Sequence, residues 1–208
     1  MISKARGKIG FLQRTLAKPF ILLGIPPNAV SVLGLILALI GALFVTQQEW
    51  LPALIFFILA PTMDLIDGTV AKAQGKTSNW GNYFETMIDK FVDFVMIGSF
   101  VFIHPVAAVL ALGFSMISSY AKPRVALIII TDNRDWPAIG EHADKLIILL
   151  LALLLAACGY YYLEQALYLM AIVALIGSLQ RMAYAKNLIG EAEKKGSLLP
   201  YIKKGKRR

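Results

Sequence analysis

The sequence is short of charged residues and contains a single cysteine. Aspartate, glutamate, lysine and arginine make up 16% of its 208 residues, well under the ~25% that is usual for soluble domains. The lone Cys158 excludes an intramolecular disulfide and carries no information on the redox compartment. Hydrophobic residues fill 58% of the chain, and the mean hydropathy is +0.66. This combination predicts an integral membrane protein, with room for about six spanning helices of ~20 residues each.

Residues 1–18 lack the apolar core and the small-residue cleavage site of a signal peptide, so we expect no cleavable signal. Residues 3–20 instead combine apolar and basic side chains. This pattern favours an amphipathic helix in the membrane interface, with lysine and arginine reaching the lipid headgroups. An ordinary soluble helix is the alternative. It is disfavoured because the first long apolar segment follows at once.

Six apolar segments follow, and we interpret each as a spanning helix. They are residues 28–46, 51–73, 80–103, 106–129, 142–157 and 162–185. Lysine and arginine gather in the N-terminal segment, in alternate connections and at the C-terminus, which is the pattern that places those parts in the cytoplasm. The sequence therefore predicts an all-α integral membrane protein, with six transmembrane helices preceded by an N-terminal amphipathic interfacial helix.

The same pattern divides the chain into three parts. Residues 1–20 form the amphipathic helix, residues 21–190 the six-helix membrane domain, and residues 191–208 a basic cytoplasmic tail. The basic tail favours attraction to anionic lipids. A solvated, unstructured end is an equally good interpretation of it.

Acidic residues are also few, yet five of the 13 lie in one stretch between apolar segments. They are Asp64, Asp67, Glu85, Asp89 and Asp93. Residues three or four apart share one face of a helix, so Asp64 and Asp67 point the same way near the end of one helix and the other three line one face of the next. The polar, turn-like link at residues 75–79 allows the two helices to fold back on each other. We expect this to bring several carboxylates together at one depth in the membrane.

Carboxylates gathered in this way repel each other unless a cation lies among them. Their hard oxygen atoms suit Mg²⁺, Mn²⁺ or Ca²⁺ far better than zinc. An acidic face turned to water is the alternative interpretation. We favour a metal site because apolar segments flank the stretch, and a carboxylate within hydrocarbon is costly and usually functional.

The same residues resemble the signature of a known family, the CDP-alcohol phosphotransferases. That signature reads D-x-x-D-G-x-x-A-R, then about eight residues, then G-x-x-x-D-x-x-x-D. The matching positions here are Asp64, Asp67, Gly68, Ala71, Lys72, Gly81, Glu85 and Asp89. Two positions depart from it: Lys72 replaces an arginine and lacks its bidentate fork, and Glu85 replaces an aspartate and reaches one methylene further.

The resemblance implies a reaction, a cofactor and a role for each carboxylate. It implies a membrane enzyme of phospholipid biosynthesis that transfers a lipid-phosphate group from a CDP-lipid, either CDP-diacylglycerol or CDP-archaeol, to a polar alcohol and releases CMP. It implies Mg²⁺ or Mn²⁺, as two ions, bound by Asp64, Asp67, Glu85 and Asp89. Asp89 would also take the proton from the attacking hydroxyl.

The resemblance also implies where the nucleotide binds. The expected nucleotide-binding residues are Asn28, Ser31, Gly68, Ala71, Lys72 and Gly81. The glycines allow close approach to the backbone, and Lys72 would meet a phosphate as a point charge. Asn28 and Ser31, in PPNAVS, resemble the family's P-N-x-x-T/S segment beside the nucleotide. A helix cap is an equally good interpretation of Asn28.

Shorter matches beyond the signature resemble the inositol-phosphate branch of the family. Residues 89–93 read DKFVD, like the branch's D-R-x-x-D, and further matches lie at residues 119–124, 141–145 and 180–181. Four cations near the cytoplasmic ends of three helices would form a pocket for a phosphate on the acceptor: Lys122, Arg124, Lys145 and Arg181. Anchoring of the helix ends in the headgroups is the alternative interpretation of each.

We therefore predict inositol phosphate as the acceptor, with glycerol phosphate second. A membrane transporter lined by carboxylates is an alternative of another class, but the outer halves of the spans are almost wholly apolar and leave no polar path. The expected partners are the CDP-lipid, the alcohol, membrane lipids and a second copy of the chain in a homodimer, with no nucleic acid. The expected location is the cell membrane, with the active site and both termini on the cytoplasmic side.

Overall fold

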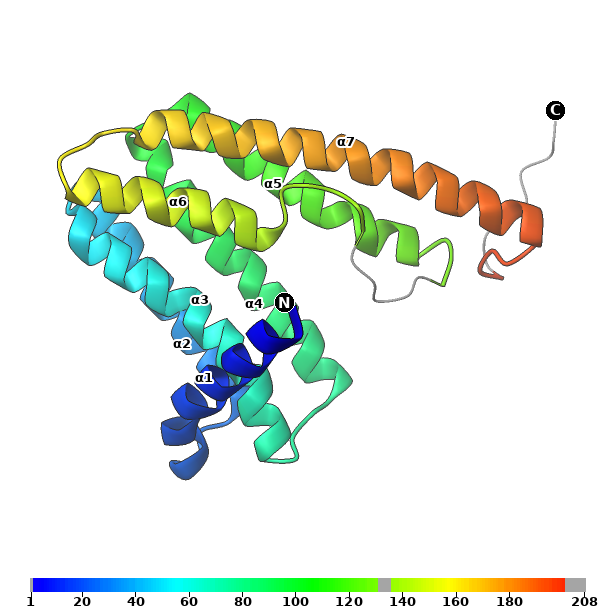
Figure 1. Ribbon diagram of the computed structural model, residues 1–208, viewed down its shortest axis with the longest axis horizontal. Coiled ribbons are helices and arrows are strands. Elements are labelled where there is room, and N and C mark those ends of the chain that lie inside the picture. The colour runs from blue at the N-terminus through cyan, green and yellow to red at the C-terminus, as the bar shows by residue number, and fades with distance from the viewer. Residues whose placement is uncertain (1, 131–135, 201–208) are drawn as a thin grey trace. The chain divides into compact units, whose positions relative to one another are not determined.

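The computed structural model describes residues 2–130 and 136–200 (Figure 1). Within these residues every regular element is a helix, apart from one isolated β-bridge between Ile129 and Leu198. The helices are α1 (Ile2–Leu22), α2 (Pro27–Thr46), α3 (Trp50–Ala73), α4 (Asn79–Gly98), the 3₁₀ helix η1 (Ser99–Phe102), α5 (Pro105–Ala126), α6 (His142–Ala157) and α7 (Leu163–Lys195). The all-α prediction is confirmed. The end of the predicted basic tail, residues 201–208, lies outside the described residues.

Two compact units make up the chain. Unit 1 contains Met1–Pro105 and Leu153–Tyr160, and unit 2 contains Val106–Ala152 and Tyr161–Arg208. Unit 1 therefore holds helices α1 to α4 with η1. Unit 2 holds α5, most of α6 and α7. The carboxylate stretch lies entirely in unit 1, and the four predicted acceptor cations lie in unit 2.

Four helices of the described residues have the length and composition to cross a membrane: α2, α3, α5 and α7. The sequence predicts two more spans, which correspond to α4 and α6. Helix α4 has 20 residues but carries four charged residues along its length, and α6 has only 16 residues. The described part of the chain is thus helical and has four candidate membrane spans.

The last helix is longer than predicted. The apolar pattern places its end near residue 185, whereas α7 continues to Lys195 and stops at Gly196, which has a positive φ of 66°. The ten added residues are mostly polar, so hydropathy alone gives no reason to extend the helix. Ala192 supplies one, since it is buried in a cluster with Val125 and Trp136. Five residues assigned by sequence to the basic tail therefore belong to α7.

Helices α2 and α3 lie side by side in unit 1 (Figure 1), and small residues of α2 lie at their contact. Gly34, Ala38 and Gly41 are all buried on one face of α2, as their spacing predicts. A Cβ on Gly34 would lie 3.0 Å from the carbonyl oxygen of Ala60, and one on Gly41 would overlap the ring of Phe57. Small residues at such positions let two helix backbones approach each other within a membrane. This contact fixes the distance between Ser31 on α2 and the carboxylates on α3.

Gly41→Ala is expected to destabilise unit 1, because the added methyl group must displace the Phe57 ring or separate the helices. Overpacking of this kind costs about 1–3 kcal/mol. The measurement is thermal unfolding of the purified protein in detergent. Gly113→Ala is the matched control, since a Cβ there meets no atom within 4 Å and alanine favours a helix over glycine. An unchanged unfolding temperature for Gly41→Ala would contradict the packing argument.

Helix α1 packs against α3 in unit 1. Ala17 is fully buried in a cluster with Val30, Met63 and Ile66, and the side-chain amide of Gln13 donates a hydrogen bond to the carbonyl of Leu65 at 3.3 Å. On its other side α1 exposes large apolar side chains, among them Phe11, Leu12 and Leu16. The helix is thus tied to the half of α3 that carries the carboxylates and leaves an apolar face uncovered within the described residues.

Candidate active site

Three carboxylates converge where α3 and α4 fold back on each other. One oxygen atom from each of Asp64, Asp67 and Glu85 lies within 4.8 Å of the others. Asp64 and Asp67 are three residues apart on α3 and share a face, and Glu85 comes from the second turn of α4. The convergence that the spacing predicts is therefore present in the structure.

The link between the two helices sets this arrangement. Helix α3 ends at Ala73, and Gly75, two residues further on, has a φ of +64°, in the left-handed region that favours glycine. Ser78 then caps α4, because its hydroxyl accepts a hydrogen bond from the backbone N–H of Gly81 at 3.0 Å. Gly81 fits here because a Cβ at this position would come within 3.1 Å of the Ser78 hydroxyl. The predicted turn at residues 75–79 is confirmed, and Ser78 is the cap that sequence reasoning missed.

A pocket of about 270 Å³ opens beside the three carboxylates. All six predicted nucleotide-binding residues line it: Asn28, Ser31, Gly68, Ala71, Lys72 and Gly81. Asp67 and Glu85 also line it, and so do Lys76, Thr77 and Asn82, which the sequence analysis did not assign. Lys76 and Thr77 lie in the polar link between α3 and α4, and the polarity of that link is the feature of the sequence from which their place at the pocket could have been predicted. The pocket thus brings two lysines and two carboxylates to one opening.

Asn28 does not cap α2. The cap position is Pro26, which makes no side-chain capping bond, and Asn28 is the second residue of the helix. Its side-chain oxygen lies 3.9 Å from the position of a Cβ on Gly81. Of the two interpretations offered by the sequence, the cap is wrong, and Asn28 lies at the pocket.

Asp67 is the most buried carboxylate of the group, at 1% exposure. Its Oδ2 accepts a hydrogen bond from the Ser31 hydroxyl at 2.5 Å, and its Oδ1 accepts one from the backbone N–H of Gly68 at 2.5 Å. Both oxygen atoms are therefore fixed by donors, one from α2 and one from α3 itself. The carboxylate has little freedom to rotate.

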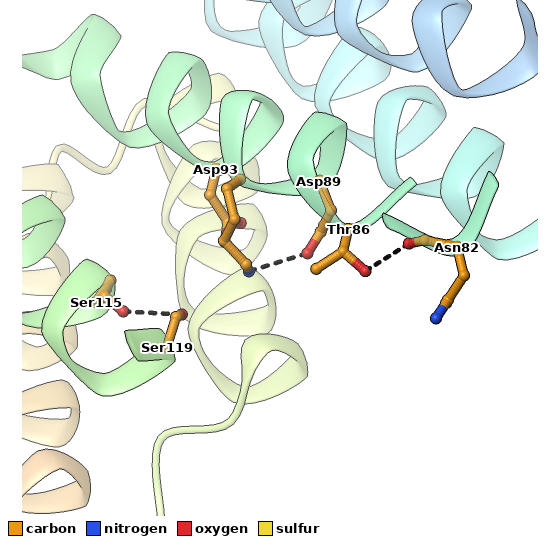
Figure 2. Close-up of polar contacts among 7 residues, drawn as sticks. Asn82, Thr86, Asp89, Asp93, Ser115 and Ser119 are labelled. Atoms are coloured by element: carbon orange, nitrogen blue, oxygen red, sulfur yellow. Dashed lines mark hydrogen bonds and ion pairs between the residues drawn. The ribbon is translucent and has the colours of Figure 1, made fainter. Parts of the chain in front are cut away.

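Asp89 lies one helical turn beyond Glu85 and is held by a lysine (Figure 2). The Lys90 ammonium lies 2.9 Å from Oδ2 of Asp89 and 3.0 Å from Oδ2 of Asp93. Lys90 thus pairs with two of the five acidic residues. The other three are the carboxylates that converge within 4.8 Å of one another. No role for Lys90 was predicted from the sequence, although its spacing to Asp93 is one at which side chains meet on a helix.

A second pocket of about 270 Å³ lies in unit 2. It is lined by Lys122, Trp136, Glu141, His142 and Arg181. Two of the four predicted acceptor cations, Lys122 and Arg181, are brought together here. The other two are not among the lining residues: Arg124 is exposed in the last turn of α5, and Lys145 is buried in the first turn of α6.

Arg181 is oriented by neighbours on two other segments of unit 2. Its Nη1 donates to the Ser118 hydroxyl at 2.7 Å and to the carbonyl of Ile139 at 3.2 Å. The N–H of Ile139 in turn donates to the side chain of Gln180 at 2.8 Å. Next to Ser118 on α5, the hydroxyl of Ser119 donates a hydrogen bond to the carbonyl of Ser115 at 3.0 Å (Figure 2). One nitrogen of the guanidinium, Nη1, is thereby fixed, and Arg181 also lines the pocket.

The three converging carboxylates fit a hard divalent cation. Asp64, Asp67 and Glu85 offer oxygen atoms only, at separations that one ion can bridge. Mg²⁺ and Mn²⁺ take such ligands, whereas zinc sites are built from histidine and cysteine. Asp67 is also buried, and a buried charge requires compensation by a partner. The donor set therefore agrees with the cofactor that the sequence predicts.

The family model of CDP-alcohol phosphatidyltransferases matches residues 25–177. The chain belongs to this family, so it is a transferase of substituted phosphate groups that acts in phospholipid biosynthesis. The match includes both carboxylate helices and every lining residue of the first pocket, whereas Arg181 of the second pocket lies beyond its end. Together with the long apolar helices, it makes the chain a membrane protein.

Two curated relatives cover most of this chain. The archaetidylinositol phosphate synthase of Pyrococcus horikoshii is 28% identical over 193 residues, which are 89% of this chain and 97% of that protein. The phosphatidylinositol phosphate synthase of Mycolicibacterium smegmatis is 28% identical over 199 residues, which are 88% of this chain and 87% of the relative.

Solved structures of a Mycobacterium tuberculosis phosphatidylinositol phosphate synthase have the same fold. Its complex with manganese and citrate has a TM-score of 0.71 at 19% identity and covers 84% of this chain and 88% of that one. The structure with CDP-DAG bound also has a TM-score of 0.71, at 20% identity, and covers 83% of this chain and 92% of that one.

Proposed function

We propose that the protein transfers a lipid-phosphate group from a CDP-lipid to inositol phosphate and releases CMP. The observation that carries this proposal is the convergence of Asp64, Asp67 and Glu85 beside a pocket that Lys72 and two glycines also line. The choice of acceptor is supported by the relatives, several of which are named as synthases of inositol-phosphate lipids. The lipid is a diacylglycerol or an archaeol: one relative is named as an archaetidylinositol phosphate synthase, and a solved structure of the same fold has CDP-DAG bound.

The residues have distinct tasks in this reaction. When bound by Asp64, Asp67, Glu85 and Asp89, two ions of Mg²⁺ or Mn²⁺ supply charge neutralisation for the attacking and leaving oxygen atoms. Lys72 contributes a further positive charge at the nucleotide phosphates. Phosphoryl transfer needs positioning and charge compensation more than covalent help, and the pocket residues supply these.

Bond making and breaking then balance as follows. An acceptor hydroxyl oxygen attacks the phosphorus that carries the lipid, and the bond from that phosphorus to the bridging oxygen breaks. CMP leaves with the bridging electron pair. Asp89 takes the hydroxyl proton, a task for which a positioned carboxylate contributes about 10²–10⁴ in rate. The ion pair with Lys90 restrains the side chain of Asp89 at this position.

The acceptor phosphate is proposed to bind the cationic residues of unit 2. Lys122 and Arg181 line one pocket and provide the main contacts. Arg124 and Lys145, which are not among the residues that line this pocket, belong to the same proposal as further cations. Arginine suits a phosphate because its planar guanidinium can donate two parallel hydrogen bonds.

The arrangement in the membrane is part of the proposal. Helix α4 continues into η1, so residues 79–102 form one helical segment, and α6, at about 1.5 Å per residue, extends about 24 Å. With these two as short spans, the six-helix topology agrees with the distribution of lysine and arginine and places the active site and both termini in the cytoplasm. Helix α1 lies in the interface with its exposed apolar face toward the lipids. The expected assembly is a homodimer in the cell membrane.

The test is a screen of the purified protein with a labelled CDP-lipid against inositol phosphate, inositol, glycerol phosphate and serine. We expect CMP release to require a divalent cation, either Mg²⁺ or Mn²⁺, and to require inositol phosphate as well. CDP-diacylglycerol and CDP-archaeol are compared in parallel. Preference for glycerol phosphate would show that inositol phosphate is not the acceptor. Preference for free inositol would show that the pocket of unit 2 does not bind an acceptor phosphate. The transporter alternative is set aside because the chain belongs to a family of transferases.

A further inference from the structure

Ser31 and Asp67 form a short hydrogen bond between helices α2 and α3. The hydroxyl oxygen of Ser31 lies 2.5 Å from Oδ2 of Asp67, and the two side chains come from positions 36 residues apart. Both residues are buried, at 5% and 1% exposure. A hydrogen bond from a hydroxyl to a carboxylate at this distance is charge-assisted and stronger than one between neutral groups.

The direction of this bond limits what Ser31 can do for a nucleotide. A serine hydroxyl has one proton to donate and two lone pairs to accept. Its other acceptor, the carbonyl oxygen of Pro27, is 3.4 Å away, so the proton goes to Asp67. Ser31 can therefore accept a hydrogen bond from a ligand in the pocket, but its only proton is already engaged.

The bond also fixes the carboxylate. Oδ1 of Asp67 is held by the Gly68 N–H, and Oδ2 is held by Ser31. With one donor on each oxygen, the plane of the carboxylate is set, and one of its oxygen atoms lies within 4.8 Å of an oxygen atom of Asp64 and of Glu85. Partners that orient a metal ligand in this way commonly change metal affinity by 10–100-fold when they are removed.

We propose that Ser31 is the positioning residue of the metal site, and that it acts by orienting Asp67 and not by donating to the nucleotide. This inference rests on the proposed function, because it takes Asp67 as a metal ligand. Ser31 thus serves the metal site through Asp67, whereas the family resemblance of the sequence implies that Ser31 binds the nucleotide. The close packing of α2 on α3 is what brings it within reach.

The test measures Mn²⁺ binding to the purified protein without any substrate, from the electron paramagnetic resonance signal of free Mn²⁺. Ser31→Thr and Ser31→Val form the matched pair, since the two side chains have nearly the same volume and differ in the hydroxyl. Ser31→Val is expected to weaken Mn²⁺ binding by 10–100-fold, and Ser31→Thr to stay within about threefold of the unmodified protein. Ser31→Ala, the smaller change, is expected to follow Ser31→Val. It provides the same comparison if the valine does not fit.

Ser99→Ala is the control for the loss of a buried hydroxyl. Ser99 is 6% exposed in unit 1 and donates to a backbone carbonyl, that of Met96, at 2.9 Å. Its removal is expected to leave Mn²⁺ affinity unchanged. Unfolding temperatures in metal-free buffer, compared across all variants, separate a weaker site from a damaged fold.

The kinetic constants distinguish the two roles of Ser31. A positioning residue changes the Mn²⁺ concentration needed for half-maximal rate, and saturating Mn²⁺ restores most of the activity of Ser31→Ala. A nucleotide contact instead raises the KM for the CDP-lipid at every Mn²⁺ concentration. Mn²⁺ affinity within twofold for Ser31→Ala and Ser31→Val, with that KM raised, would overturn the inference.

Asp67→Asn separates this inference from the proposed function. If Asp67→Asn loses Mn²⁺ binding while Ser31→Val keeps it, only the role of Ser31 is wrong. If Asp67→Asn binds Mn²⁺ as tightly as the unmodified protein, both the metal site and the role of Ser31 are wrong.

Discussion

Asp67→Asn is expected to abolish turnover while the protein remains folded. Asparagine has nearly the same size and shape as aspartate. Its amide oxygen can accept from the Gly68 N–H, and its NH₂ group can donate to the Ser31 hydroxyl, which is able to accept as well as donate, so the buried site can hold it. It lacks the negative charge that a divalent cation requires from its ligand. A cation stabilises the transition state by several kcal/mol. Losing roughly 4 kcal/mol of this lowers the rate by about 10³-fold. The measurement is CMP release at saturating CDP-lipid, acceptor and Mg²⁺.

Although Asp67→Asn loses activity, its stability in metal-free buffer should not fall. Three carboxylates within 4.8 Å repel each other in metal-free buffer, and Asp67 is buried at 1% exposure. Removing its charge relieves both the repulsion and the cost of burial. The metal-free Asp67→Asn variant is therefore expected to unfold at the same or a higher temperature than the unmodified protein, and to gain less from added Mn²⁺.

Glu191→Gln is the matched control for the loss of one acidic charge. Glu191 forms an exposed ion pair with Lys195 on α7, at 3.6 Å, and exposed pairs of this kind contribute little. Both activity and stability should be nearly unchanged. Near-full activity of Asp67→Asn in Mg²⁺ would show that Asp67 is not a ligand of the catalytic metal.

The sequence predicts those parts of the site that depend on spacing within one helix or across a short link. Asp64 and Asp67 share a face because they are three residues apart, and the polar link at residues 75–79 returns the chain over a short distance. The same holds for the small face of α2, where Gly34 and Gly41 are two helical turns apart. Periodicity is a local property, so these features follow from the order of the residues.

The parts that the sequence could not predict depend on contacts between distant segments. Ser31 reaches Asp67 because α2 packs closely on α3, and no spacing rule connects residues 36 positions apart. Arg181 is fixed by Ser118 and Ile139, which belong to two other segments. The end of α7 was misplaced for a related reason, since tertiary packing of Ala192 outweighs the polar composition around it.

The four acceptor cations illustrate the same limit. Their sequence matches are of similar quality, yet only Lys122 and Arg181 line the pocket of unit 2. Helical ends carry lysine and arginine for membrane anchoring as well as for binding. Which of them faces a pocket is decided by the rotation of each helix, and hydropathy at a helix end does not specify that rotation.

Arg181→Gln is expected to raise the KM for inositol phosphate strongly and to leave the KM for the CDP-lipid nearly unchanged. The loss of a charge-assisted contact costs about 1.5–3 kcal/mol, which corresponds to roughly 10- to 150-fold in that KM. The CDP-lipid should not respond, because its phosphates are bound in unit 1 by the metal site and Lys72. The measurement is initial-rate kinetics with each substrate varied in turn.

Two comparison variants separate phosphate binding from anchoring in the headgroups. Arg14→Gln removes an exposed arginine from α1, where anchoring is the expected role. It should leave both KM values within about twofold. Arg181→Lys keeps the charge but loses the planar fork that Ser118 and the carbonyl of Ile139 hold in place. Its acceptor KM should therefore lie between those of the unmodified protein and Arg181→Gln. If Arg14→Gln and Arg181→Gln have the same small effect, Arg181 is an anchor, and the acceptor phosphate binds elsewhere.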